Sequence, residues 1–163
     1  MFPGFDDPVK RRILAVLQRE GRLTNQELAE RVGISASPCW RRVKELEESG
    51  VIRRYAALLD PQKVGVGECV FVQVELQPGS RDVSGAFERA VKERSEISEC
   101  YAVTGVADFL LKIHVPDVRA YDRLLSEVIL RLPGVARVRS SFALREVKYD
   151  TALPLPESEE GRR

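Results

Sequence analysis

Hydrophobic residues in the first third of the chain recur every three or four positions, which is the spacing of amphipathic helices. The pattern predicts helices over residues 8–20, 24–32 and 35–49. Asp7 and Pro8 can begin the first helix, because the fixed φ of proline suits the first helical position, and Gly21 ends it. The buried stripe of this helix is predicted to consist of Val9, Ile13, Val16 and Leu17. Residues 1–60 are therefore expected to fold as three helices around a small core.

The second and third predicted helices carry the signals of a helix-turn-helix. Thr24 and Glu27 can form a reciprocal capping box. Gly33 can end the second helix with a positive φ, and Ser35 can cap the third, with Pro38 in its first turn. The short Gly-Ile-Ser turn between them makes the pair compact, as DNA-binding helix-turn-helix units are.

The third helix has two distinct faces when it is rotated by about 100° per residue. Cys39, Val43 and Leu46 lie together and are predicted to face the core, whereas the opposite face is cationic. Such a helix suits a DNA major groove, in which cations reach phosphates. With a short basic extension after the helix, the predicted DNA-contacting residues are Ser35, Ser37, Trp40, Arg41, Arg42, Lys44, Arg53 and Arg54. Glutamates add negative charge to the second half of the helix, so the alternative to DNA contact is an ordinary solvated face of an amphipathic helix.

From residue 68 the hydrophobic pattern changes to the alternation of β-strands. It predicts strands over residues 68–76, 97–104, 109–115 and 135–149, and helices over 82–91 and 117–132. The order βαββαβ is that of a ferredoxin-like unit, with one sheet and two helices over one face. The chain as a whole is thus predicted to be α+β: a winged helix-turn-helix domain followed by a ferredoxin-like domain.

Composition divides the chain into four segments. Residues 1–60 form the DNA-binding domain, and 61–67 are a linker because one proline and two glycines disfavour regular structure. Residues 68–150 form the second domain. Residues 151–163 are proline-rich and acidic and are predicted to be disordered.

The other face of the predicted sheet has no helix to cover it. Cys69 and Phe71 point to that face, and an apolar patch on an uncovered sheet marks an interface. A second copy would cover it, giving an isologous homodimer. Charge supports pairing: residues 1–60 hold 11 Lys/Arg against 9 Asp/Glu, so one copy offers few cations to phosphates.

Composition excludes several other classes of protein. Hydrophobic residues make up 44% and charged residues 31%, as in ordinary globular domains. No apolar run approaches a membrane span and the first residues do not resemble a signal peptide, so a cytoplasmic protein is expected. Three separated cysteines and a single histidine predict no metal site, and no cofactor motif is present.

Three stretches of this sequence resemble one known family. GISASPCWRRVKELEESGVIRRYAALLDPQKVG, ECYAVTGVADFLLKIHV and RLPGVARVRSSFALREVK are similar to the Lrp/AsnC (feast/famine) transcription regulators of prokaryotes. The resemblance runs from Asp7 to Lys148. It implies a DNA-binding domain joined to an ACT-like effector-sensing domain, an assembly of dimers that reaches octamers, and an amino acid as the small effector.

In the family, the effector binds near the turn between the second and third strands. The corresponding residues here are Tyr101, Thr104, Gly105, Val106, Ala107 and Asp108. Gly105 and Asp108 match the family motif, but Val106 and Ala107 replace an acidic and an aromatic residue. A basic effector would lose its charge partner, so a neutral amino acid, or no effector, is favoured. For Asp108 two interpretations are open: a ligand for an α-amino group, or a turn residue that bonds the backbone.

Two other functions are compatible with this architecture. Sirohaem decarboxylases resemble these regulators but are enzymes that use histidine, and the single histidine here offers little acid–base chemistry. The third hypothesis is a sensing or assembly module that binds no DNA. A DNA-binding regulator, which is no enzyme, is the function that the sequence favours.

Overall fold

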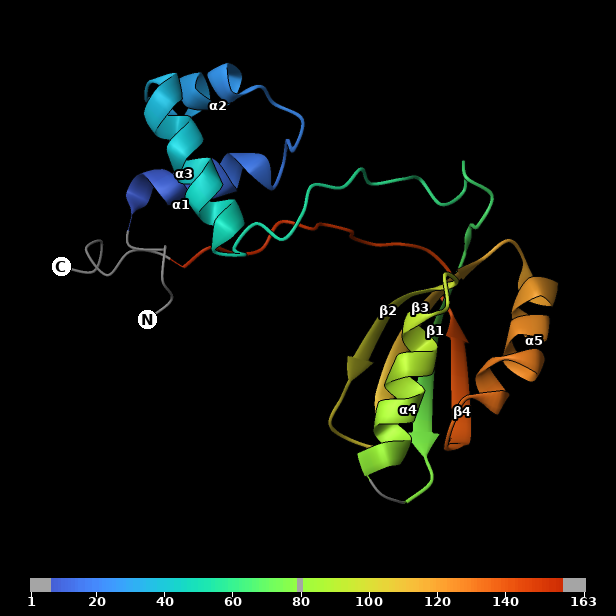
Figure 1. Cartoon of the computed structure of the whole chain (residues 1–163). Helices are drawn as coiled ribbons and strands as arrows, with labels where there is room; N and C mark the ends of the chain where they lie inside the picture. The colour runs from blue at the N-terminus through green and yellow to red at the C-terminus, as the bar shows by residue number, and fades with distance from the viewer. Residues whose placement is uncertain (1–6, 79–80, 157–163) are drawn as a thin grey trace. The chain divides into compact units, whose positions relative to one another are not determined.

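The structure is a computed structural model that describes residues 7–78 and 81–156. The chain divides into two compact units. Unit 1 contains the residues up to Ala57 together with those from Lys148 onwards, and unit 2 spans Leu58–Val147 (Figure 1). Unit 1 is therefore assembled from both ends of the described chain.

Unit 1 contains three helices; the second and third end within one residue of their predicted bounds, whereas the first ends at Leu17 and not at Gly21 as predicted. They are α1 (Pro8–Leu17), α2 (Asn25–Val32) and α3 (Ala36–Glu48). Asp7 caps α1, the Thr24–Glu27 capping box is formed, and Gly33 ends α2 with a φ of 75°. Ser35 occupies the N-cap position of α3, although its side chain makes no capping hydrogen bond.

The three helices enclose one hydrophobic core. Its buried residues are Ile13, Leu14, Leu28, Ala29, Val32, Cys39 and Leu46. Leu14 is absent from the predicted stripe of α1, whereas Val9, Val16 and Leu17 are only partly buried. The stripe is rotated because α2 and α3 both contact α1, so the helix is enclosed on two sides.

Unit 2 is a four-stranded antiparallel sheet with two helices on one face. Its elements are β1 (Glu68–Leu76), α4 (Arg81–Lys92), β2 (Ile97–Ala102), β3 (Phe109–Val115), α5 (Val118–Glu127), a 3₁₀ turn η1 (Ile129–Arg131) and β4 (Val135–Phe142). The strand order is β2-β3-β1-β4, and α4 and α5 pack against the same core (Figure 1). This arrangement confirms the predicted βαββαβ fold.

The two faces of this sheet differ sharply. On the helix side Val70, Val72 and Val74 are fully buried with Leu111 and Ile113. On the other face the side chain of Phe71 stays 40% exposed and that of Tyr101 53% exposed. The uncovered apolar face that the alternation predicts is therefore present.

Besides α1, three regular elements are shorter than predicted. β2 ends at Ala102. β4 ends at Phe142, which pairs with Val70 of β1, and one more backbone hydrogen bond follows, from the N–H of Ala143 to the carbonyl of Cys69 (2.9 Å). α5 ends at Glu127 and passes into the 3₁₀ turn. Residues 53–60 form no strand and are exposed, so the described part of unit 1 contains no two-stranded wing.

The C-terminal segment contacts α1, which the predicted disorder of residues 151–163 does not anticipate. The Gln18 amide donates from Nε2 to the carbonyl of Leu153 (3.2 Å) and accepts at Oε1 from its N–H (2.6 Å). Leu155 packs against the helical core. Residues 157–163 lie outside the described part, and for them disorder stays a prediction.

Candidate functional site

The third helix of unit 1 presents one face to the core and the other to solvent. Cys39 is 0% exposed and Leu46 is 1% exposed. On the opposite side Trp40 is 56% exposed, an unusual degree for so large an apolar side chain. Of the predicted DNA-contacting residues, Arg42 is half-buried, and the exposed ones are Ser35, Ser37, Trp40, Arg41, Lys44, Arg53 and Arg54.

Arg42 makes an ion pair at the start of α1. Its Nε lies 2.8 Å from Oδ2 of Asp7, and Oδ1 of Asp7 accepts the N–H of Val9 at 2.8 Å. Both carboxylate oxygens are thus used, one as a helix cap and one as a link between α1 and α3. The DNA contact of Arg42 stays a prediction, and the structure gives this residue a second, stabilising task.

The acid–base equilibrium of Asp7 should make part of the stability of unit 1 depend on pH. Partial burial raises the pKa of Asp7, but the hydrogen bonds from Arg42 and Val9 outweigh burial and hold it below 3.8. Stabilisation by the carboxylate is present above pH 3.8 and is lost as the pH falls through the lower folded-state pKa.

We therefore expect Asp7→Ala to lower the free energy of unfolding of unit 1 by about 1–2 kcal/mol at pH 7. The difference from the parent should shrink towards pH 3. Urea unfolding followed by the fluorescence of Trp40, the one tryptophan in the chain, measures it. Asp7→Asn is the control, because it keeps a cap and loses only the charge. A deficit of Asp7→Ala that stays the same at both pH values would contradict the assignment.

Glutamates hold the exposed cations of α3 close to the helix. Glu45 lies 2.7 Å from Lys10 Nζ and 3.8 Å from Arg41 Nε, and Glu47 lies 3.2 Å from Lys44 Nζ. Exposed pairs of this kind stabilise a protein only weakly. A DNA phosphate can therefore replace these carboxylates as the partner of Arg41 and Lys44 at small energetic cost.

The turn between β2 and β3 is anchored by Asp108. Its Oδ2 accepts the N–H of Leu76 at 2.7 Å, and its own N–H donates to the carbonyl of Val74 at 3.0 Å. The backbone-bonding interpretation of Asp108 thus describes the structure, but the partner lies on β1 rather than in the turn. Asp108 is exposed, and its other carboxylate oxygen, Oδ1, accepts no hydrogen bond from the described residues.

The other residues of the predicted effector site are placed unequally. Val106 is 76% exposed and Ala107 is 8% exposed, so only the first presents its side chain to solvent. Gly105 adopts a φ of 119°, which glycine tolerates without strain. Thr104 is exposed, and the Tyr101 hydroxyl donates to Glu99 at 2.7 Å. The structure brings residues 104–106 together at the surface and directs Ala107 inward.

Sequence reasoning missed the polar neighbours of Tyr101. Glu99 accepts from Tyr101 and also pairs with Lys112 at 3.2 Å on the uncovered face of the sheet. The hydrogen bond from Tyr101 is the largest contribution that lowers the pKa of Glu99. The proximity of Glu99 and Tyr101 could have been predicted, because residues two apart on one strand point to the same face. The contact with Lys112 depends on the pairing of β2 with β3.

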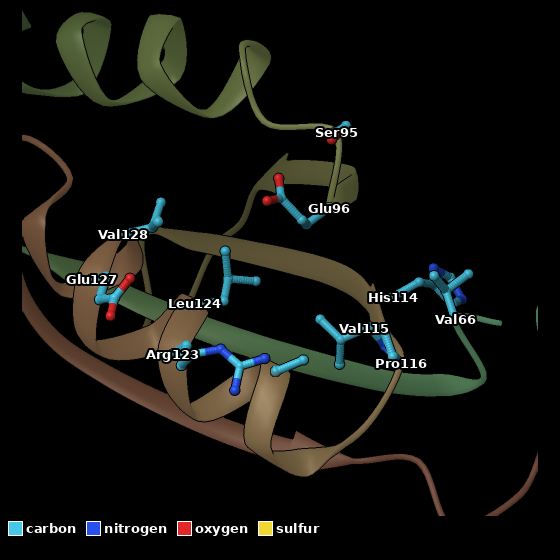
Figure 2. A pocket seen from close by; sticks show the side chains of 11 residues that line it. Val66, Ser95, Glu96, His114, Val115, Pro116, Arg123, Leu124, Glu127 and Val128 are labelled. Atoms are coloured by element: carbon cyan, nitrogen blue, oxygen red, sulfur yellow. The ribbon is translucent and has the colours of Figure 1, made fainter.

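Unit 2 also contains two surface cavities. One, of about 470 Å³, lies beside α5 and the end of β3 (Figure 2). The other, of about 440 Å³, lies between α4 and β2. Neither is lined by the turn residues 104–108. Within residues 7–78 and 81–156, no cluster of His, Cys, Asp or Glu is placed to hold a metal ion, and no helix is long and apolar enough to cross a membrane.

Sequence comparison identifies both units. A winged helix-turn-helix DNA-binding domain model matches residues 6–53, and a model of the Lrp/AsnC ligand binding domain matches residues 69–153. The leucine-responsive regulatory protein of Escherichia coli strain K12 is 46% identical over 152 residues, which cover 93% of each protein. That of Salmonella typhimurium has the same identity and coverage.

Solved structures agree with the sequence comparison. A transcriptional regulator from Neisseria meningitidis in complex with L-Met superposes with a TM-score of 0.88 at 42% identity, over 91% of this chain and 96% of that one. An AsnC family regulator from Agrobacterium tumefaciens gives a TM-score of 0.87 at 42% identity, over 91% and 97%. These relatives are regulatory proteins, so the comparisons do not favour the alternative of an enzyme similar to sirohaem decarboxylases. The matches place a DNA-binding domain and a ligand-binding domain in one chain, in the same order and over nearly the same length as in these relatives. This chain therefore belongs to the Lrp/AsnC family of transcription regulators.

Proposed function

We propose that the exposed face of α3 is the surface with which this regulator reads DNA. The observation that carries the proposal is the division of α3, whose core side is closed by Cys39 and Leu46 while Trp40 and the cations face solvent. Ser35, Ser37 and Trp40 stand at the N-terminal end, the part of a recognition helix that reaches base edges. Arg53 and Arg54 follow α3 and supply contacts to phosphates. We propose the cytoplasm as its location, because a regulator with this task must reach DNA.

The effector is proposed to be a neutral or apolar amino acid at the Gly105–Asp108 turn. Val106 is exposed there and carries no charge, whereas the free oxygen of Asp108 can accept from an α-ammonium group. The Neisseria meningitidis regulator was solved with L-Met, which is neutral and apolar. This likeness supports the same chemical class of effector here.

Footprinting on the DNA upstream of the protein's own gene tests both proposals together. We expect protection of a site with two half-sites, changed by L-leucine or L-methionine and unchanged by L-lysine. Protection that persists at high salt would exclude phosphate contacts as its basis. A footprint that no neutral amino acid changes would remove the effector proposal and leave the DNA proposal standing.

Dimerisation through the uncovered sheet is proposed as the way in which two α3 helices reach DNA. Phe71 is flanked by Lys112 on β3 and Ser141 on β4, so it stands near the middle of this face. Leu110 and Tyr101 extend the apolar surface towards β2. A second copy placed face to face would bury them, as sheets in sandwiches do.

Phe71→Asp should therefore convert the dimer to a monomer in sedimentation velocity. The side chain is 40% exposed, so the unit should fold unchanged, whereas a dimer would bury two added carboxylates at the centre of its interface. Leu130→Asp is the matched control, because Leu130 is an exposed apolar residue (53%) in η1, outside this face. Equal oligomeric states for the two variants would exclude this sheet as the interface.

A further inference from the structure

We propose that the cavity beside α5 is a second small-molecule site, which binds a zwitterion of the amino-acid type independently of the Gly105–Asp108 turn. The cavity of about 470 Å³ forms where the end of β3, one side of α5 and the connection from α4 to β2 meet. Its volume falls in the range of small-molecule sites. All the lining residues belong to unit 2.

The cavity carries charges of both signs. Arg123 and Glu127 come from α5, and Glu96 comes from the connection to β2 and lies across the cavity from Arg123 (Figure 2). In the described part of the chain, none of these three side chains takes part in an ion pair. Arg123 and Glu127 are four residues apart on one helix, a spacing at which such pairs commonly form. Their charges are thus available to a ligand.

These charges match the two ends of a zwitterion. A guanidinium can bind a carboxylate through two parallel hydrogen bonds, which assigns the ligand carboxylate to Arg123. An ammonium group has three donors, and Glu96 and Glu127 can accept them. His114 also lines the cavity, and burial lowers its pKa, with a smaller contribution from Lys112. A neutral imidazole adds no competing positive charge.

Apart from Ser95, the rest of the lining is apolar. Leu124 is 7% exposed and Val115 is 3% exposed, so they form a dry floor. The other apolar lining residues are Val66, Pro116, Ala120 and Val128. An apolar substituent on the ligand would be removed from water here, with a stabilisation of about 25 cal/mol for each Å² buried.

This cavity is distinct from the family's turn. Asp108 precedes β3 and His114 stands near its end, so the two sites are about 20 Å apart at the rise of an extended strand. Val66 adds a connection to DNA binding. It belongs to a tight turn, in which its N–H donates to the carbonyl of Pro61 at 2.9 Å, within the segment that leads from unit 1 into β1. A ligand in the cavity would therefore contact the segment that joins the two units.

Titration calorimetry of the full-length protein with the common L-amino acids tests the proposal. We expect at least one apolar amino acid to bind, and the Arg123→Met variant to bind it at least about tenfold more weakly at one site for each chain. Analogues of that amino acid that lack the ammonium or the carboxylate should bind the parent protein as weakly as the amino acid binds Arg123→Met. Glu96→Gln should reduce affinity for the amino acid but not for the analogue that lacks the ammonium.

Matched controls keep the test specific. Arg119→Met removes an exposed cation from the same helix and Glu93→Gln an exposed carboxylate from the same connection, and neither residue lines the cavity. Both should bind like the parent. Equal binding by Arg123→Met and Arg119→Met would overturn the proposal, as would the absence of any binding at about 10 mM ligand. Asp108→Asn should leave this binding unchanged, which separates the cavity from the effector proposed at the turn.

Discussion

Replacing Cys39 with aspartate is expected to unfold the DNA-binding unit. The Cys39 side chain is 0% exposed and lies in the core shared by α1, α2 and α3. Burial already raises the pKa of its thiol, although the charge of Arg42 partly opposes this effect. The site therefore disfavours a negative charge. A carboxylate there would be buried without a sufficient partner, and we expect a loss of more than about 4 kcal/mol in the free energy of unfolding.

The single tryptophan makes this measurement specific. Trp40 belongs to unit 1, so its fluorescence during urea unfolding reports on this unit alone. Cys39→Ala is the matched control and should cost only about 1 kcal/mol, because it deletes one small apolar group. Cys100→Asp places the same charge at an exposed position of unit 2 and should leave the Trp40 transition unchanged. A Cys39→Asp variant that unfolds like the parent would show that α3 turns another face to the core.

The second large effect concerns the cations on the other face of α3. We expect the double variant Arg41→Ala/Lys44→Ala to bind operator DNA at least about tenfold more weakly. Each phosphate that loses its protein cation keeps its condensed counterions, so fewer counterions are released when the protein binds. The slope of log affinity against log salt should fall by about 0.9 for each phosphate that the variant no longer neutralises. Both residues are exposed and paired only with neighbouring glutamates, so the fold should persist.

Mobility shift at several salt concentrations measures both quantities. Lys63→Ala is the matched control, since the Lys63 side chain is 83% exposed but lies in the turn that leads into β1. It should bind like the parent with the same slope. The groove assignment of α3 would be wrong if the double variant and Lys63→Ala gave superimposable curves.

Features that depend on residues close in sequence were predictable. The Thr24–Glu27 capping box, the positive φ of Gly33 and the inward face of Cys39 and Leu46 all follow from local spacing. The alternation of β1 likewise identified the buried and uncovered faces of the sheet.

Contacts between distant residues were not predictable from these patterns. Asp108 bonds Leu76, 32 positions away, and Arg42 bonds Asp7, 35 positions away. Each sequence segment contains only half of the interaction, and either half alone is compatible with a solvated side chain. The cavity beside α5 was missed for the same reason, since Glu96, His114 and Arg123 meet only after the sheet has formed.

The pairing of Gln18 with Leu153 has a consequence for synthesis of the protein. The two residues are 135 positions apart, so a ribosome completes α1, α2 and α3 long before it adds the segment that packs against them. Nascent chains fold from the N-terminus as they emerge, and contacts between such distant positions form late because the closing loop costs entropy. Until Leu155 has been added and has left the ribosome, the apolar surface beside α1 that receives it is open to chaperones and to other nascent chains.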